Sequence, residues 1–259
     1  MFNDIQWDKF VIVIFVLAPL MTAANILTIK ETACLSGVEI SYLSAFRVLV
    51  MSSAANNLPL PGGPVVRIAV FCEAGATVKS ASLANLAGGI LWMGATFTIA
   101  GAFALSINSL FGIGLFTVGV GLCVFGARLC ASLPGRIVNG LRLFLISCSA
   151  AVLYCVALYH AMAALGAPTG LPEAFVISVA GVVGAALSPT PSGFGIRESL
   201  SAGLASTVGA APAVAFAATA LVYLTMLGLL ALSAVIFSAS PLKHHFSQKT
   251  NSTQMNDLL

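Results

Sequence analysis

Two short stretches of this chain decide how it folds: Pro-Leu-Pro-Gly-Gly-Pro-Val-Val-Arg at residues 59–67 and Pro-Thr-Pro-Ser-Gly-Phe-Gly-Ile-Arg at residues 189–197. Both follow the pattern Pro-x-Pro-x-Gly-x-x-(Val or Ile)-Arg, and the second copy begins 130 residues after the first, at Pro189 after Pro59. Proline and glycine interrupt helices, because proline lacks a backbone donor and glycine carries the largest entropic cost of ordering. Arginine is scarce in this chain, so the shared pattern indicates an internal duplication in which each copy contains a broken helix.

The composition restricts the class of protein. Of the 259 residues, 59% are hydrophobic and only 7% are charged, and the mean hydropathy is +1.04. Soluble domains carry about 25% charged residues, so too little charge is present to cover a surface that faces water. This balance excludes a soluble globular protein, a disordered chain, a nucleic-acid-binding protein and a secreted disulfide scaffold. We therefore expect an all-α polytopic membrane protein with a single transmembrane domain over residues 1–239.

Long apolar runs predict five full membrane spans, since about 20 apolar residues cross a bilayer. These runs cover residues 10–29, 82–107, 110–130, 141–166 and 212–238. Two other segments, 40–78 and 171–208, each consist of two short apolar arms on either side of a repeated break. Arms of this length are more typical of re-entrant segments than of full crossings. The sequence therefore predicts two broken re-entrant hairpins between the spans.

The residues expected to form the breaks fall in two groups. They are Asn57, Pro59, Pro61, Gly62 and Gly63 in the first hairpin, and Pro189, Pro191, Ser192, Gly193 and Gly195 in the second. Backbone groups freed at membrane depth need partners. We expect the side chains of Asn56 and Asn57 to bond to such groups.

Lysine and arginine residues between the spans predict the orientation, because they are enriched in cytoplasmic loops. If both hairpins are re-entrant, one side of the membrane holds all the basic loop and tail residues except Lys9, namely Lys30, Lys79, Arg128, Arg136, Arg142, Lys243 and Lys249. If the first arms cross fully instead, the bias weakens to five against three. The re-entrant arrangement makes the halves 9–107 and 141–238 inverted repeats joined by helix 110–130. The polar tail, residues 240–259, is then cytoplasmic.

Inverted repeats with broken helices are a recurring plan of transporters, and a few charged residues in the hairpins suggest what such a site binds. Arg67 and Arg197 each follow a break near the expected start of a helical arm, where free N–H groups and a guanidinium favour an anion. The alternative is that each arginine only neutralises a carboxylate, Glu73 or Glu198, or caps a hairpin carbonyl. The two glutamates are candidate proton carriers or partners of the arginines. Arg47, on the leading arm of the first hairpin, either lines the same cavity or extends to the interface.

Catalytic and metal-binding patterns are missing from the sequence. It shows no Ser/His/Asp set, no paired catalytic carboxylates, no P-loop and no dinucleotide fingerprint. Its six cysteines form no Cys-x-x-Cys pair and no cluster with histidine, so a metal or redox site is not indicated. We expect a protein that is not an enzyme and that uses no cofactor.

The two motifs are similar to those of a known family. Residues 191–198 resemble the P-G-G-x-G-x-R-E signature of the lysylphosphatidylglycerol synthase transmembrane region, also called the flippase-like domain family. Residues 57–63 together with Arg67 are similar to that family's N-x-x-x-P-G…R element. The resemblance covers most of residues 10–238, but only these two elements are specific.

Three departures accompany the resemblance. Residues 64–66 are Pro-Val-Val where the family usually has an acidic residue, and Tyr223 stands in the last span, where an arginine is common. The third departure is length: compared with typical members we expect a shorter protein without a soluble aminoacyl-transfer domain.

The resemblance implies a multi-pass protein of the bacterial inner membrane. Its expected activity is movement between leaflets of an anionic phospholipid, a hopanoid or a polyprenyl-phosphate sugar, with the headgroup bound by the motif arginines. The alternative is a non-transporting subunit that positions a partner membrane enzyme, such as a glycosyltransferase. No nucleic-acid partner is expected.

Overall fold

The computed structural model describes residues 5–57, 62–135, 137–187 and 193–239. Within these ranges the chain is entirely helical and no residue forms a β-strand. The described residues form nine helices, when α1, η1 and α2 are counted as one continuous helix. Five of the nine are long and apolar enough to cross a membrane. The expected fold class, all-α with five spans, is confirmed.

Each of the long helices exceeds the thickness of a bilayer core. They are the continuous helix of α1 (Trp7–Ile12), η1 (Val13–Leu17) and α2 (Ala18–Leu35), then α5 (Val78–Ala104), α6 (Ser109–Ala131), α7 (Ile137–Ala164) and α10 (Pro212–Ala239). At 1.5 Å per residue the shortest of them is about 35 Å long, against about 30 Å of hydrocarbon. The first helix changes to a π-turn at η1, which ends two residues before Pro19, a residue that cannot donate a backbone hydrogen bond.

The first span is longer than its apolar run predicts. We expected it to end at Ile29, but the helix continues to Leu35 and includes Lys30 and Glu31. The Lys30 Nζ atom donates to the Ile40 carbonyl at 3.2 Å and lies 4.3 Å from the centre of the Tyr42 ring. Because the Lys30 ammonium has these partners near the end of the helix, the helix can continue beyond the last residue of the apolar run.

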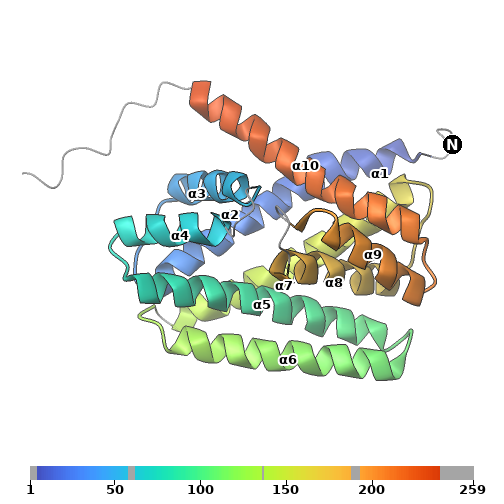
Figure 1. The fold of residues 1–259 in the computed structure, drawn as a ribbon, viewed down its shortest axis with the longest axis horizontal. Helices are drawn as coiled ribbons and strands as arrows, with labels where there is room; N and C mark the ends of the chain where they lie inside the picture. Colours follow the sequence, from blue (N-terminus) through green and yellow to red (C-terminus); the bar gives the residue numbers. More distant parts are fainter. Residues whose placement is uncertain (1–4, 58–61, 136, 188–192, 240–259) are drawn as a thin grey trace, which may run out of the picture.

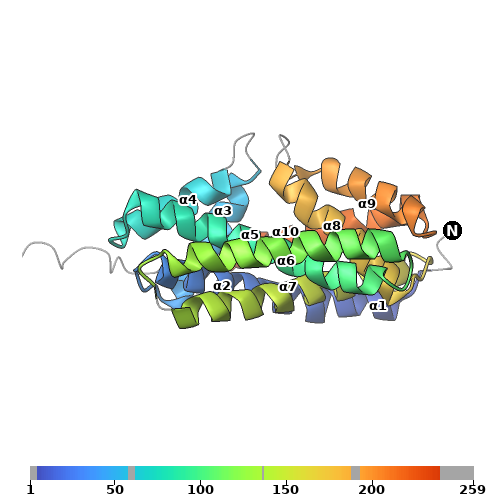
Figure 2. The ribbon, with the colours of Figure 1, turned by 90° about the horizontal axis from the view of Figure 1, so that it is seen from below.

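Four short helices form two hairpins. The first hairpin is α3 (Tyr42–Ala55) followed by α4 (Gly62–Glu73), and the second is α8 (Leu171–Leu187) followed by α9 (Ile196–Thr207). The two 12-residue helices α4 and α9 are each about 18 Å long, too short to cross a bilayer. Figure 2 shows the pairs side by side on one face of the long helices.

The two hairpins begin and end at opposite ends of the molecule. At one end, the Ser80 hydroxyl donates to the Ser36 carbonyl at 3.1 Å, and the Gly135 N–H donates to the Leu35 carbonyl at 3.2 Å. These bonds join the end of α2, the start of α5 and the α6–α7 turn, so the first hairpin starts and finishes there. We call this the basic end, because it carries the described basic residues Lys30, Lys79, Arg128 and Arg142.

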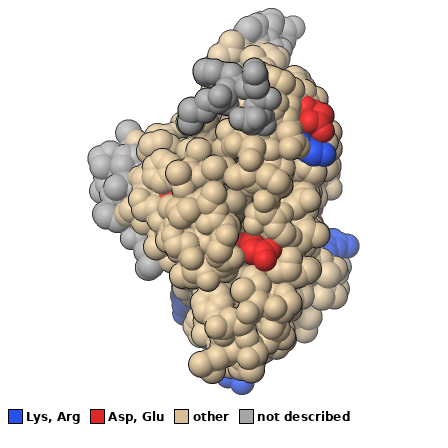
Figure 3. Space-filling model, turned by 90° about the vertical axis from the view of Figure 1, so that its right-hand side faces the viewer, with Lys and Arg blue, Asp and Glu red and all other residues tan. Residues whose placement is uncertain are grey.

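The second hairpin starts and finishes at the other end. There the Gln6 N–H donates to the Ala164 carbonyl at 3.1 Å, and the Phe103 and Phe175 rings stack at 4.2 Å. In both hairpins, the last residues of the first helix and the first residues of the second helix lie toward the middle of the molecule (Figure 1 and Figure 2). Figure 3 shows the surface at this end, which is mostly uncharged with a few charged residues.

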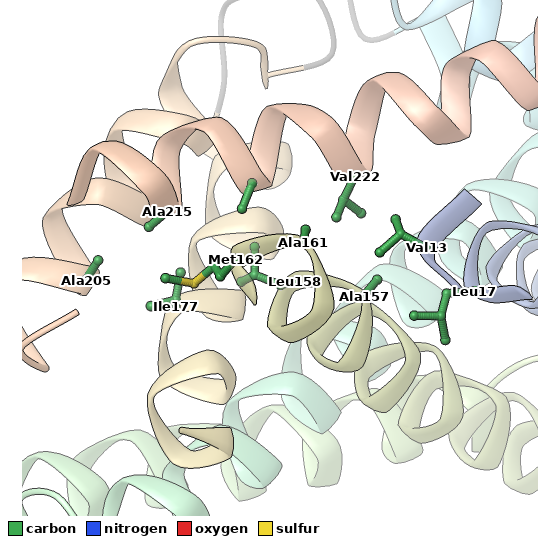
Figure 4. Packing of buried hydrophobic residues seen from close by; sticks show 11 residues of the cluster. Val13, Leu17, Ala157, Leu158, Ala161, Met162, Ile177, Ala205, Ala215 and Val222 are labelled. Carbon is green, nitrogen blue, oxygen red and sulfur yellow. The ribbon is translucent and has the colours of Figure 1, made fainter. Parts of the chain in front are cut away.

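The interior contains small and aliphatic side chains. One cluster joins α10, α7, α8, α9 and η1 (Figure 4); its buried members are Val13, Leu17, Ala157, Leu158, Ala161, Met162, Ile177, Ala205, Ala215, Ala218 and Val222. The α5–α6 pair packs more closely still. A Cβ atom on Gly119 of α6 would collide with the Thr98 backbone, and one on Gly101 of α5 with the Phe116 backbone. Helices in lipid associate through close packing of this kind. The hydrophobic effect does not drive them together there, because lipid tails are as apolar as the side chains.

The element order repeats with the motif. Helix α1 begins at Trp7 and α7 at Ile137, 130 residues later, the same interval that separates the two motifs. The contacts repeat with exchanged partners: α5 packs on α4 and α8, whereas α10 packs on α9 and α3. Both observations agree with the duplication that the sequence indicates. The predicted tail, 240–259, lies outside the described residues.

Candidate functional site

The second break leads directly into α9. Gly193 and Gly195 have φ angles of +72° and +87°, a region that favours glycine because it has no Cβ. Helix α9 therefore starts at Ile196, and Arg197 and Glu198 occupy its first turn. The Gly195 N–H donates to Glu198 Oε2 at 2.6 Å, and the Glu198 side chain is fully buried. Glu198 thus caps the helix that begins at the break.

Arg197 lies between α8 and α10. A Cβ atom on Gly184 of α8 would collide with Arg197 Cγ and would reach its Cα at 2.8 Å, so this close approach requires glycine. The Arg197 Cζ atom lies 4.0 Å from the centre of the Tyr223 ring on α10. A cation–π contact of this kind contributes roughly 0.5–2 kcal/mol, depending on desolvation.

The guanidinium of Arg197 has unused donors. Its Nε and Nη2 atoms are buried and have no hydrogen-bond partner among the residues that the structure describes. The two atoms share one edge of the guanidinium plane, and this edge can donate two parallel hydrogen bonds to a carboxylate or phosphate. A buried donor without a partner is costly, so the edge is suited to a ligand.

The first break is closed by asparagines. Asn56 Oδ1 accepts from the Gly63 N–H at 2.9 Å, and Asn57 Nδ2 donates to the Ser53 carbonyl at 3.1 Å. The expectation that both asparagines bond to backbone groups at the break is confirmed. Gly62 lies so close to the Ala55 carbonyl that a Cβ atom would collide with it.

Arg67 lies near the start of α4, as the motif suggested, but one turn inside the helix and not in its first turn. Helix α4 already begins at Gly62, because Gly62 and Gly63 pack directly on the end of α3 and Pro64 is tolerated in a first turn. Arg67 is therefore in the second turn. It is half-buried, and its Nε atom donates to the Ser52 hydroxyl of α3 at 3.5 Å.

Tyr223 connects the two breaks. Its hydroxyl donates to Asn57 Oδ1 at 3.2 Å, its ring receives Arg197, and the Phe194 ring lies 6.3 Å away. We call Asn57, Phe194, Arg197 and Tyr223 the break site. The site unites residues from both hairpins and from the last span. The sequence singled out Tyr223 only through the family resemblance, and Phe194 only as a variable position of the motif.

The remaining candidates lie apart from the break site. Glu73 is exposed at the last residue of α4, and Arg47 is half-buried in the first half of α3. Among the described residues, neither Arg67 nor Arg197 forms an ion pair; the two ion pairs found there are Lys9–Asp8 and Arg142–Glu31. Neither Glu73 nor Glu198 forms an ion pair with Arg67 or Arg197 in the part of the chain that the structure describes, so no contact supports the neutralising role considered for the two glutamates. Pro59, Pro61, Pro189, Pro191 and Ser192 lie outside the described residues.

Two polar residues near the hairpins were not among the site residues predicted from the sequence. Glu31 is buried on α2, with Oε1 4.0 Å from Arg142 Nη1 and with no partner in the described chain for Oε2. Tyr154 of α7 packs so closely on Gly181 of α8 that an added Cβ atom would collide with the tyrosine ring and hydroxyl. The three-residue spacing of Gly181 and Gly184 was the available signal, since it places two small residues on one face of α8.

The fold defines the class: this is a multi-pass membrane protein with five long apolar helices and two short helical hairpins. Within the described residues, no three His, Cys, Asp or Glu side chains gather in a way that could hold a metal ion. No protein-family model, no curated protein and no solved structure matches the chain.

Proposed function

We propose that this protein moves an anionic lipid or a lipid-linked glycan between the leaflets of a membrane. The observation that carries the proposal is the Nε/Nη2 edge of Arg197, buried and without a partner among the described residues, at the break of a hairpin. A charge within the hydrocarbon is expensive and is rarely idle. The motif resemblance to the flippase-like family supports the same activity.

The hairpin geometry suits movement across a bilayer. We interpret α3–α4 and α8–α9 as re-entrant hairpins of two inverted repeats, because they enter from opposite ends and contain helices too short to span. The basic end is then cytoplasmic by the positive-inside rule. In this arrangement a headgroup would reach Arg197 near the middle of the membrane, with Arg67 on the facing hairpin. By family resemblance the membrane is the bacterial inner membrane.

The donor edge favours some cargoes over others. A phosphate on an anionic phospholipid or a polyprenyl-phosphate sugar can accept two parallel hydrogen bonds from Arg197. A hopanoid would need an acidic substituent to use the same contact. The proposal therefore places phosphate-bearing lipids before hopanoids.

Transfer of a labelled lipid in proteoliposomes tests the proposal. Fluorescent phosphatidylglycerol is placed in both leaflets, and a membrane-impermeant quencher reports how fast the inner pool becomes accessible. We expect transfer by the wild type and by Arg128→Ala, a control that removes an exposed arginine at the basic end. We expect its loss in Arg197→Ala. Equal transfer by all three proteins would refute the proposed binding residue.

The alternative function, a subunit that positions a partner membrane enzyme, rests on α6. This helix packs on α5 through Gly112, Gly119 and Gly126, whereas Gly114 and Gly121 are exposed and have nothing within 4 Å of an added Cβ. Small residues on a lipid-facing helix allow a second helix to approach. Co-purification of one stoichiometric membrane enzyme, together with no lipid transfer by the isolated protein, would favour this function.

A further inference from the structure

The contacts of Tyr223 extend beyond a packing role. Tyr223 lies in the middle of α10, the helix that packs on α9 of the second hairpin and on α3 of the first. Its ring and its hydroxyl serve different partners. The ring faces Arg197, with 4.0 Å between Cζ and the ring centre, and the hydroxyl donates to Asn57 at 3.2 Å.

The ring contact determines which part of Arg197 is available. A guanidinium held against an aromatic face keeps its edges free for hydrogen bonds, because the π-system attracts the cation without accepting an N–H in the plane. In this protein the edge that stays unpartnered among the described residues is Nε/Nη2, and both atoms are buried. Gly184 of α8 packs against the backbone and the aliphatic part of Arg197, because Arg197 Cα and Cγ lie directly over this glycine.

The hydroxyl contact determines whether the breaks can separate. Asn57 is anchored to α3 through the Ser53 carbonyl, and Arg197 belongs to the first turn of α9. Tyr223 is therefore a bridge from one hairpin to the other. If a headgroup passes between the breaks, as the proposed function requires, it displaces this bridge.

We infer that Tyr223 is a positioning residue with two separable effects. Its ring sets the Arg197 edge to bind one oxyanion of a lipid headgroup, and its hydroxyl holds the two breaks together until the headgroup moves. This inference rests on the proposed function. The position that corresponds to Tyr223 in the first half, 130 residues earlier, is Met93, which offers neither a hydroxyl nor an aromatic ring.

Two substitutions separate the effects. Tyr223→Phe keeps the ring and removes the hydroxyl, whereas Tyr223→Leu removes both. The probe is fluorescent phosphatidylglycerol: its affinity is measured by titration into the purified protein in micelles, and its transfer rate in vesicles of phosphatidylcholine. We expect Tyr223→Phe to keep the affinity within about twofold and to raise the maximal transfer rate about fivefold, from the loss of one hydrogen bond. We expect Tyr223→Leu to weaken the affinity about fivefold as well.

A matched control is Tyr42, whose ring receives Lys30 at 4.3 Å at the basic end. Tyr42→Leu removes a cation–π contact away from the breaks and should change neither quantity. The inference is wrong if Tyr223→Phe leaves the transfer rate unchanged, or if affinity and rate fall together in both Tyr223 variants, as a general loss of structure would produce. A separate result identifies failure of the proposed function itself: wild type that neither binds nor transfers the probe, or Arg197→Ala that does both normally.

Discussion

The two hairpins carry the same motif and use it differently. In the first, Arg67 lies one turn inside α4 and donates to Ser52 of its own hairpin. In the second, Arg197 lies in the first turn of α9, contacts the Tyr223 ring and keeps two buried donors without a described partner. A duplication supplies equal residues to both halves, but local helix starts decide what those residues can do. The difference makes the second break the better candidate for a ligand site.

The largest expected effect comes from removing one arginine at a time. Arg197→Ala should slow lipid transfer about 10- to 100-fold, since hydrogen bonds to charged groups contribute roughly 1.5–3 kcal/mol. Arg67→Ala should slow it less than about fivefold, because Arg67 already donates to Ser52. Proteoliposome transfer rates of the two variants measure the difference. Equal losses of transfer rate in the two variants would mean that both arginines contribute alike to transfer. The structural difference between the two breaks would then have no functional effect.

The next effect tests the close packing under Arg197. Gly184→Ala should lower the free energy of unfolding by about 1–3 kcal/mol, because the new Cβ meets the Arg197 backbone. Titration of the protein in mixed micelles with a denaturing detergent measures this free energy. Gly203→Ala on α9 is the control, since nothing lies within 4 Å of an added Cβ there. Similar unfolding of both variants would show that α8 and α9 can separate without loss.

A smaller effect concerns the backbone of the second break. Gly195→Ala should destabilise the protein by about 1–2 kcal/mol, because its φ of +87° is unfavourable for a residue with a Cβ. Gly114→Ala, in the middle of α6 with open space around it, should be neutral or stabilising by about 0.5–1 kcal/mol. The same unfolding titration compares them, and a Gly195 variant as stable as the wild type would disprove the strain.

The smallest effect concerns the first break. Asn56→Ala removes the acceptor of the Gly63 N–H and should reduce the free energy of unfolding by about 1 kcal/mol. Because Asn56 is outside the break site, lipid affinity should stay within about twofold of wild type. A large loss of affinity in this variant would place the first break in the binding site and remove the asymmetry between the hairpins.

Hydropathy and the Pro/Gly motifs predicted the five long helices and the hairpin arms, because these depend on apolar length and on local backbone preferences. The position of Arg67 within α4 was not predictable in this way. It depends on how closely Gly62 approaches the Ala55 carbonyl, a contact between two helices. The break site could not be predicted from local sequence patterns, because the hydrogen bond between Tyr223 and Asn57 joins residues that are 166 positions apart.

The close packing of α5 on α6 has a mechanical consequence. Along this pair the Gly101 and Gly119 backbones meet the opposite helix with no side chain between them, so neither helix can slide or rotate without a collision. The two helices together form a stiff wall, and α5 supports one arm of each hairpin. If the protein moves a headgroup as proposed, we expect the hairpins to tilt against the α5–α6 pair, because this pair resists sliding and rotation.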